Sequence, residues 1–114
     1  LLAEEGKLDG AKAHLANVYK EVDDDALKPL VSLRMAQVDL GLKQYDDALN
    51  VLNISIPDAY QALFAEMKAD IYRAKGDSAK AIELYQSALD QSAQGSRNID
   101  IIKMKLNALG ETAS

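Results

Sequence analysis

Apolar residues recur along this chain at helical spacing, and turn residues interrupt them at regular intervals. The pattern predicts helices over residues 8–21, 29–42, 45–52, 59–75, 78–92 and 98–110. Pro29 suits the first turn of a helix, and Pro57 restarts the chain because proline fixes φ and lacks an amide hydrogen. Residues 1–5 resemble the tail of an earlier helix that Gly6 ends, and residues 92–98 form a loop rich in Ser, Gly and Asn. The expected fold class is all-α.

One short block recurs within these helices. Gly76-Asp77-Ser78-Ala79-Lys80-Ala81 leads to Tyr85 and Ala88, and the same register leads from Ala48 to Leu52 and Ser55 and from Ala11 to Leu15 and Val18. The small residues Ala11, Ala48 and Ala81 are 37 and 33 positions apart, close to the roughly 34-residue period of tetratricopeptide (TPR) repeats. A single helical hairpin cannot bury its own apolar face, so the sequence predicts a TPR-like solenoid whose surfaces bind other proteins.

We expect one TPR-like domain over residues 1–114. It would comprise a partial repeat one (1–22), repeat two (24–56), repeat three (57–92) and a capping helix (98–110). The last helix carries a narrow apolar stripe made of Ile99, Ile102, Leu106 and Leu109. This stripe should dock on the second helix of repeat three (helix B) and close the solenoid. A coiled-coil-like contact with a partner would use the same stripe.

Composition and charge exclude several classes of function. The chain is 48% hydrophobic but only 5% aromatic, which favours helices rich in Ala and Leu over strands. Its net charge of −5 and the lack of a basic stripe argue against nucleic-acid binding. The sequence has no cysteine and no run of apolar residues long enough to span a membrane. Residues 23–25 are three aspartates, which we interpret as a linker and N-cap rather than a calcium loop.

Nothing in the sequence favours catalysis, a cofactor or a metal. The lone His14 has no Cys and no turn-related carboxylate beside it, and we expect it to be a solvated helix residue. Tyr45, Tyr72 and Tyr85 occupy positions that TPR repeats use for packing, which favours a role in the core over ligand stacking. We therefore expect a binding protein and not an enzyme.

The first helix of each repeat (helix A) should supply the partner-binding groove. By resemblance to TPR proteins, the groove residues are Leu30, Leu33, Gln37 and Leu40 in repeat two and Leu63, Glu66, Asp70 and Arg73 in repeat three. The other interpretation is that the leucines belong to the core and the charges are merely solvated. If Glu66 and Asp70 face the groove, they favour neutral or basic partner segments. As exposed charges they should contribute little to stability.

Several longer segments resemble a particular family. Leu33-Arg34-Met35-Ala36-Gln37-Val38, Leu42-Lys43-Gln44-Tyr45-Asp46-Asp47-Ala48-Leu49, Lys75-Gly76-Asp77 and Lys103-Met104-Lys105-Leu106-Asn107-Ala108-Leu109 occur in the order seen in YfgM-type proteins. The resemblance covers roughly residues 24–110, and its last element is the most specific. It implies an ancillary subunit of the bacterial SecYEG translocon, with a single membrane helix and a periplasmic TPR domain.

The resemblance implies a scaffold that links a PpiD-type periplasmic chaperone, and emerging polypeptides, to the SecYEG channel. We interpret the chain as a piece of a longer protein of the bacterial inner membrane, whose anchor and first repeat helices precede it. Membrane attachment would then depend only on that preceding helix. The alternative is a generic TPR adaptor, cytosolic or lipoprotein-anchored, that binds peptide segments of a larger assembly.

Overall fold

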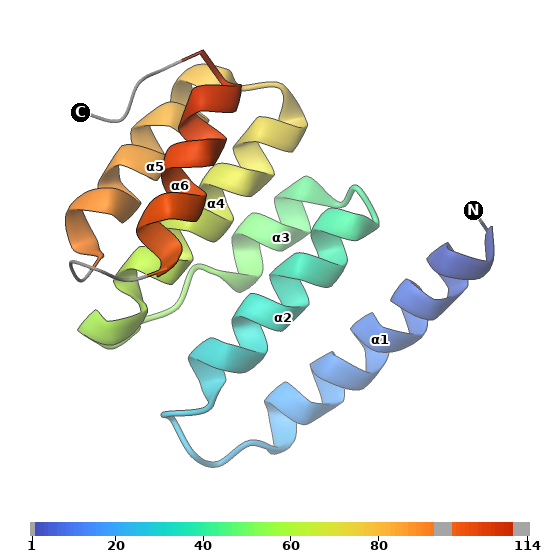
Figure 1. Cartoon of the computed structure of the whole chain (residues 1–114). Coiled ribbons are helices and arrows are strands. Elements are labelled where there is room, and N and C mark those ends of the chain that lie inside the picture. The colour runs from blue at the N-terminus through green and yellow to red at the C-terminus, as the bar shows by residue number, and fades with distance from the viewer. Residues whose placement is uncertain (1, 93–96, 111–114) are drawn as a thin grey trace. The chain divides into compact units, whose positions relative to one another are not determined.

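The computed structural model describes residues 2–92 and 97–110, with side chains for residues 6–92 and 99–110. Its elements are α1 (Leu2–Glu21), α2 (Lys28–Gly41), α3 (Tyr45–Val51), the 3₁₀ helix η1 (Asp58–Tyr60), α4 (Gln61–Lys75), α5 (Ser78–Gln91) and α6 (Arg97–Ala108) (Figure 1). They form two compact units, Leu1–Ser55 and Ile56–Ser114. The boundary between the units falls at the predicted junction of repeats two and three.

The predicted all-α, TPR-like fold is confirmed, and most helix ends lie within a residue or two of their predicted positions. Pro29 lies in the first turn of α2, where its missing amide hydrogen has no partner to lose. Pro57 is extended and precedes η1, which leads directly into α4. Residues 93–96 of the predicted loop lie outside the described residues.

The predicted helix end at Gly6 is wrong. Helix α1 runs without interruption through Gly6 and Gly10. Neither glycine takes the positive φ that ends a helix, unlike Gly76 with φ 92°. A glycine inside a helix costs about 1 kcal/mol relative to alanine, which weakens a helix without ending it. The residues on either side favour the helix, so the two predicted segments merge into one.

The predicted role of the aspartates as an N-cap is also wrong. The residue that precedes α2 is Leu27, and no side chain caps the helix. Instead, Asp24 Oδ1 accepts a hydrogen bond from the Ala26 amide at 2.9 Å, and the Asp24 carbonyl accepts one from the Leu27 amide. Asp24 therefore folds the turn before the helix, as aspartates commonly do. Asp25 forms an exposed ion pair with Lys28 at 3.5 Å.

In the first unit, α2 lies between α1 and α3 (Figure 1). Ala36 of α2 and Ala48 of α3 are fully buried, so the two backbones approach closely. The Ser32 hydroxyl, also buried, donates to the Val51 carbonyl at 2.7 Å and satisfies an acceptor at the end of α3. On the other side of α2, the Leu8 side chain would lie 3.1 Å from a Cβ added to Gly41. A glycine at this position therefore lets α1 pack closely against α2.

Each helical hairpin has a turn between its two helices, and the α2–α3 and α4–α5 turns have the same hydrogen bonds. In the first unit, the amides of Lys43 and Gln44 donate to the carbonyls of Leu40 and Asp39. Thirty-three residues later, the amides of Gly76 and Asp77 donate to the carbonyls of Arg73 and Tyr72. The left-handed position is held by Gly76 in one turn and by Lys43, with φ 61°, in the other. This match confirms the 33-residue register between the hairpins.

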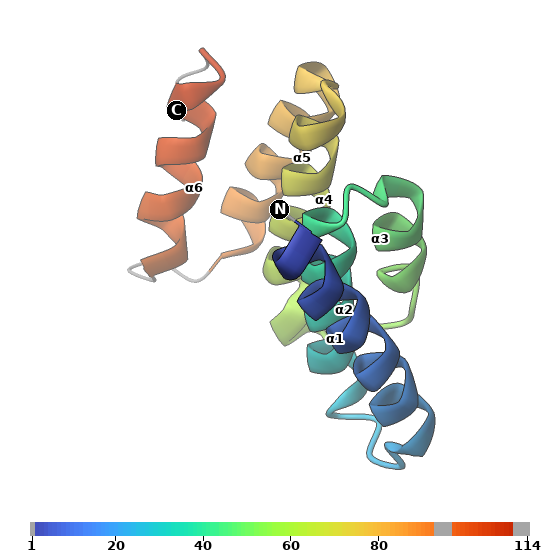
Figure 2. The same ribbon diagram turned by 90° about the vertical axis from the view of Figure 1, so that its right-hand side faces the viewer.

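The second unit consists of the α4–α5 hairpin and α6, which lies along one side of it (Figures 1 and 2). Four alanines bring α4 and α5 together around the fully buried Tyr85, and Ile102 and Leu106 of α6 complete this core. Its buried members are Ala65, Ala69, Ala81, Tyr85, Ala88, Ile102 and Leu106. Ile102 and Leu106 are buried against α5 as predicted, and the same core cluster also includes Ala65 and Ala69 of α4.

Candidate protein-binding site

A lysine of α6 binds two carboxylates of α4. Lys105 Nζ lies 2.7 Å from Glu66 Oε2 and 3.0 Å from Asp70 Oδ1. The Tyr85 hydroxyl donates a hydrogen bond to Asp70, and the Lys105 ammonium lies 5.8 Å from the centre of the Tyr85 ring. We call Glu66, Asp70 and Tyr85 the lysine cradle. Each partner in it is at most about one-fifth exposed, so solvent screens the ion pairs less than at an open surface.

The cradle shifts the titration of its own members. Burial by itself would lower the pKa of Lys105, but the hydrogen bond to Glu66 and the charge of Asp70 outweigh burial and raise that pKa. Burial, together with the hydrogen bond to Asp70, raises the pKa of Tyr85. Lys105 is therefore charged, and Tyr85 is a neutral donor, at neutral pH.

The cradle changes the interpretation of the predicted groove residues in repeat three. Glu66 and Asp70 do lie on one face of α4, but their carboxylates are bound by Lys105. The prediction that they are merely solvated charges is wrong, because both carboxylates pair with Lys105 of α6 and are less than one-fifth exposed. Arg73 is exposed at the last turn of α4. Leu63 is 37% exposed at its first turn.

A second ion-pair network joins the helices of the first unit. Lys12 Nζ of α1 lies 2.9 Å from Asp39 Oδ1 of α2 and 3.1 Å from Asp47 Oδ2 of α3, and it donates to the Gln44 side chain. Asp39 is buried, with 2% of its side chain exposed, so Lys12 is a cation paired with a carboxylate that has little access to solvent. Pairing with Asp39 raises the pKa of Lys12 despite an opposing contribution from desolvation. The network fixes α1 and α3 on α2.

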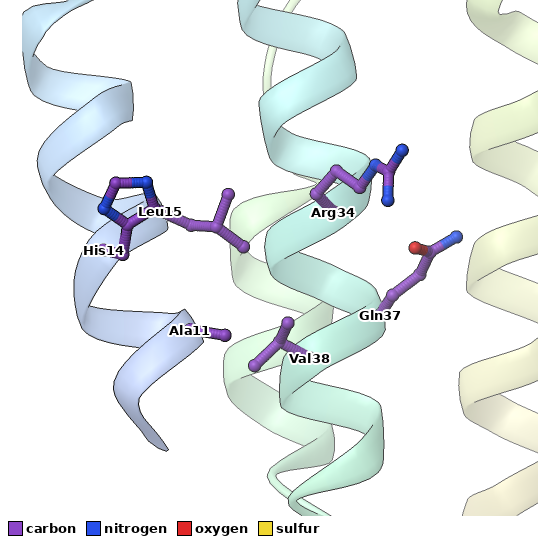
Figure 3. A pocket seen from close by; sticks show the side chains of 6 residues that line it. All are labelled: Ala11, His14, Leu15, Arg34, Gln37 and Val38. Atoms are coloured by element: carbon purple, nitrogen blue, oxygen red, sulfur yellow. The ribbon is translucent and has the colours of Figure 1, made fainter. Parts of the chain in front are cut away.

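A hollow with a volume of about 380 Å³ opens between α1 and α2 (Figure 3). Six residues line this α1–α2 hollow: Ala11, His14, Leu15, Arg34, Gln37 and Val38. Leu15 extends from α1 toward α2, and Val38 lies between the two helices (Figure 3). Arg34 and Gln37 line the α2 wall of the hollow, and their polar ends point away from α1 (Figure 3). An apolar floor with a few polar groups at its rim is typical of ligand-binding hollows.

The structure separates the predicted groove residues of repeat two. Gln37 is exposed and lines the α1–α2 hollow, whereas Leu33 and Leu40 are partly buried. Leu30 is 46% exposed one turn before Arg34. Sequence reasoning missed Arg34 and the α1 side of the hollow. The 33-residue register did not indicate that Arg34 lies at the surface, because it matches Arg34 with Met67, which is buried.

His14 is exposed, as predicted, and contributes one side of the rim. Among the residues that the structure describes, no three His, Cys, Asp or Glu side chains gather as metal ligands would. Nor does any helix in the described part have the length and apolar character needed to cross a membrane.

Comparison with known proteins agrees with the repeat architecture. The tetratricopeptide repeat-like domain family matches residues 1–111. An ancillary SecYEG translocon subunit of Neisseria gonorrhoeae is 32% identical over 90% of this chain, and one of Haemophilus influenzae is 32% identical over 93%. The Escherichia coli protein of the same name is 26% identical over 93%.

The chain spans about half the length of these relatives, namely 49%, 51% and 51%. No solved structure matches the chain significantly. The relatives confirm the resemblance to YfgM-type proteins that the sequence segments indicated. This chain belongs to the tetratricopeptide repeat-like domain family.

Proposed function

We propose that this chain is the protein-binding part of an ancillary subunit of the SecYEG translocon. In the intact protein, a preceding membrane helix would hold it at the periplasmic face of the bacterial inner membrane. There it would link a PpiD-type chaperone, and emerging polypeptides, to the channel. The names of the relatives support the translocon, and the TPR-like hairpins support protein binding without a catalytic step.

The observation that carries this proposal is a difference between the faces of α2 and α4, which are the first helices (helix A) of the two hairpins. The face of α4 binds α6 of its own chain through the lysine cradle. The face of α2 instead presents Gln37 and Arg34 beside the α1–α2 hollow. We therefore assign partner binding to the face of α2, with Leu33, Gln37 and Leu40 as its helix A residues. Glu66 and Asp70 serve to hold α6.

Site-specific photocrosslinking in the full-length protein tests this assignment. A photoreactive phenylalanine replaces Gln37 at the hollow, and in a matched variant it replaces Asn50, an exposed residue of α3. We expect the Gln37 variant, and not the Asn50 variant, to crosslink to a SecYEG subunit or to the chaperone. Asp47 would be a poor control position, because its carboxylate binds Lys12.

Equal crosslinking from the two positions would contradict the assigned surface. Crosslinks from Gln37 to cytosolic proteins alone would instead favour a generic TPR adaptor. Crosslinks from neither position would place partner binding outside the α2 face.

A further inference from the structure

The α1–α2 hollow differs in charge from the protein as a whole. The chain has a net charge of −5, yet none of the six lining residues is acidic. Two of them, His14 and Arg34, carry basic groups, and Gln37 adds an amide. Arg34 is exposed and makes no ion pair with any residue that the structure describes. The hollow therefore offers a cation without a counter-charge.

Helix α6 provides an internal example of a ligand on a helix A face. It presents Ile102 and Leu106 to an apolar core and Lys105 to the carboxylates of Glu66 and Asp70. The 33-residue register matches Glu66 with Leu33 and Asp70 with Gln37. The face of α2 thus lacks both acceptors that hold a lysine on α4. A basic segment would find no counter-charge there and would be repelled by Arg34.

We propose that the α1–α2 hollow binds an acidic amphipathic segment of a partner protein. An apolar side chain of the partner would lie on Leu15 and Val38, and a neighbouring Asp or Glu would pair with the Arg34 guanidinium, which suits carboxylates in a bidentate geometry. Leu30 lies four residues before Arg34 on the same side of α2 and extends the apolar contact. This inference rests on the proposed function and adds the chemistry of the partner to it.

Three helical peptides of equal length test the proposal. All carry leucine at i, i+3, i+4 and i+7, and the flanking positions are Glu in the first, Gln in the second and Lys in the third. Fluorescence anisotropy with the present chain measures each dissociation constant. We expect the Glu peptide to bind at least about tenfold more tightly than the Lys peptide, and added salt to reduce this difference.

Two charge-reversal variants locate the interaction. Arg34→Glu should abolish or invert the preference for the Glu peptide. Lys103→Glu changes the net charge equally at an exposed position of α6, and it should keep the order of the three peptides. Circular dichroism of both variants checks that they remain folded.

Each other outcome has a defined meaning. Tighter binding of the Lys peptide, an order unchanged by Arg34→Glu, or no binding of any peptide would overturn the proposed partner chemistry. Crosslinks from Gln37 to the translocon would still support the proposed function in those cases. If the peptides bind in the expected order but Gln37 gives no translocon or chaperone crosslink, the hollow retains its acidic ligand and the assignment of translocon or chaperone binding to the α2 face fails.

Discussion

Truncation of Leu106 tests whether α6 is an integral part of the second unit. Its side chain is fully buried, and its core neighbours include Ala65, Ala69 and Ala88. Alanines have no side-chain rotamers with which to fill a cavity, so the space left by Leu106→Ala should largely persist. Leucine-to-alanine changes cost about 2 to 5 kcal/mol, and poor relaxation favours the upper half of that range. We therefore expect a loss of about 3.5 to 5 kcal/mol.

Urea unfolding followed by circular dichroism measures this loss. With a slope of about 1 to 3 kcal/mol per molar urea, the midpoint should fall by at least about 1 M. Met104→Ala is the matched control, because Met104 lies on the same helix but is 70% exposed. Its midpoint should change little, since exposed substitutions usually stay within about 0.5 kcal/mol.

Equal midpoints for Leu106→Ala and Met104→Ala would show that Leu106 contributes no buried contact to the second unit. A smaller loss accompanied by fast amide exchange in α6 alone would have another meaning. It would show that α6 detaches before the hairpin unfolds, so that its docking energy limits the measured effect.

Three further predictions concern charges and turns. Lys105→Met should destabilise the second unit by about 1 to 3 kcal/mol in the same assay, because it leaves Glu66 and Asp70 close together without their cation. The folded state raises the pKa of Lys105, so this stabilisation should be fully present below the ordinary lysine pKa. It should be lost only as the pH rises through the folded pKa, above 10.5. Lys12→Met should destabilise the first unit by leaving Asp39 buried without its cation, and adding Asp39→Asn should recover part of the midpoint; no recovery would show that Asp39 is not the cause. Lys43→Gly should raise the thermal midpoint, because a left-handed backbone costs a lysine about 1 to 2 kcal/mol and costs a glycine little. Gly76→Ala should lower the midpoint at the matching turn for the same reason. Shifts of the same sign would contradict the shared turn geometry.

The sequence predicts features that depend on neighbouring positions and misses those that depend on docking. The recurrence of Ala48 and Ala81 locates the hairpins because small residues are needed wherever helix backbones approach closely. The stripe of Ile102 and Leu106 likewise predicts a docked helix. Lys105 gives no such signal, because Glu66 lies 39 residues earlier and only the folded unit brings the two together. Gly6 was misleading because a glycine can either end a helix or lie inside one.

The two helix A faces show how similar repeats acquire different ligands. The turns and the small core residues of the two hairpins match at a spacing of 33 residues, so their scaffolds present equivalent positions. At those positions, Glu66 and Asp70 on α4 correspond to Leu33 and Gln37 on α2. The carboxylates select the lysine of α6, which is tethered to the same hairpin and therefore has a high effective concentration. Without carboxylates, the face of α2 cannot bind this helix in the same way. Under the proposed function, the exchange of two side chains assigns the face of α4 to holding α6 and leaves the face of α2 for a partner.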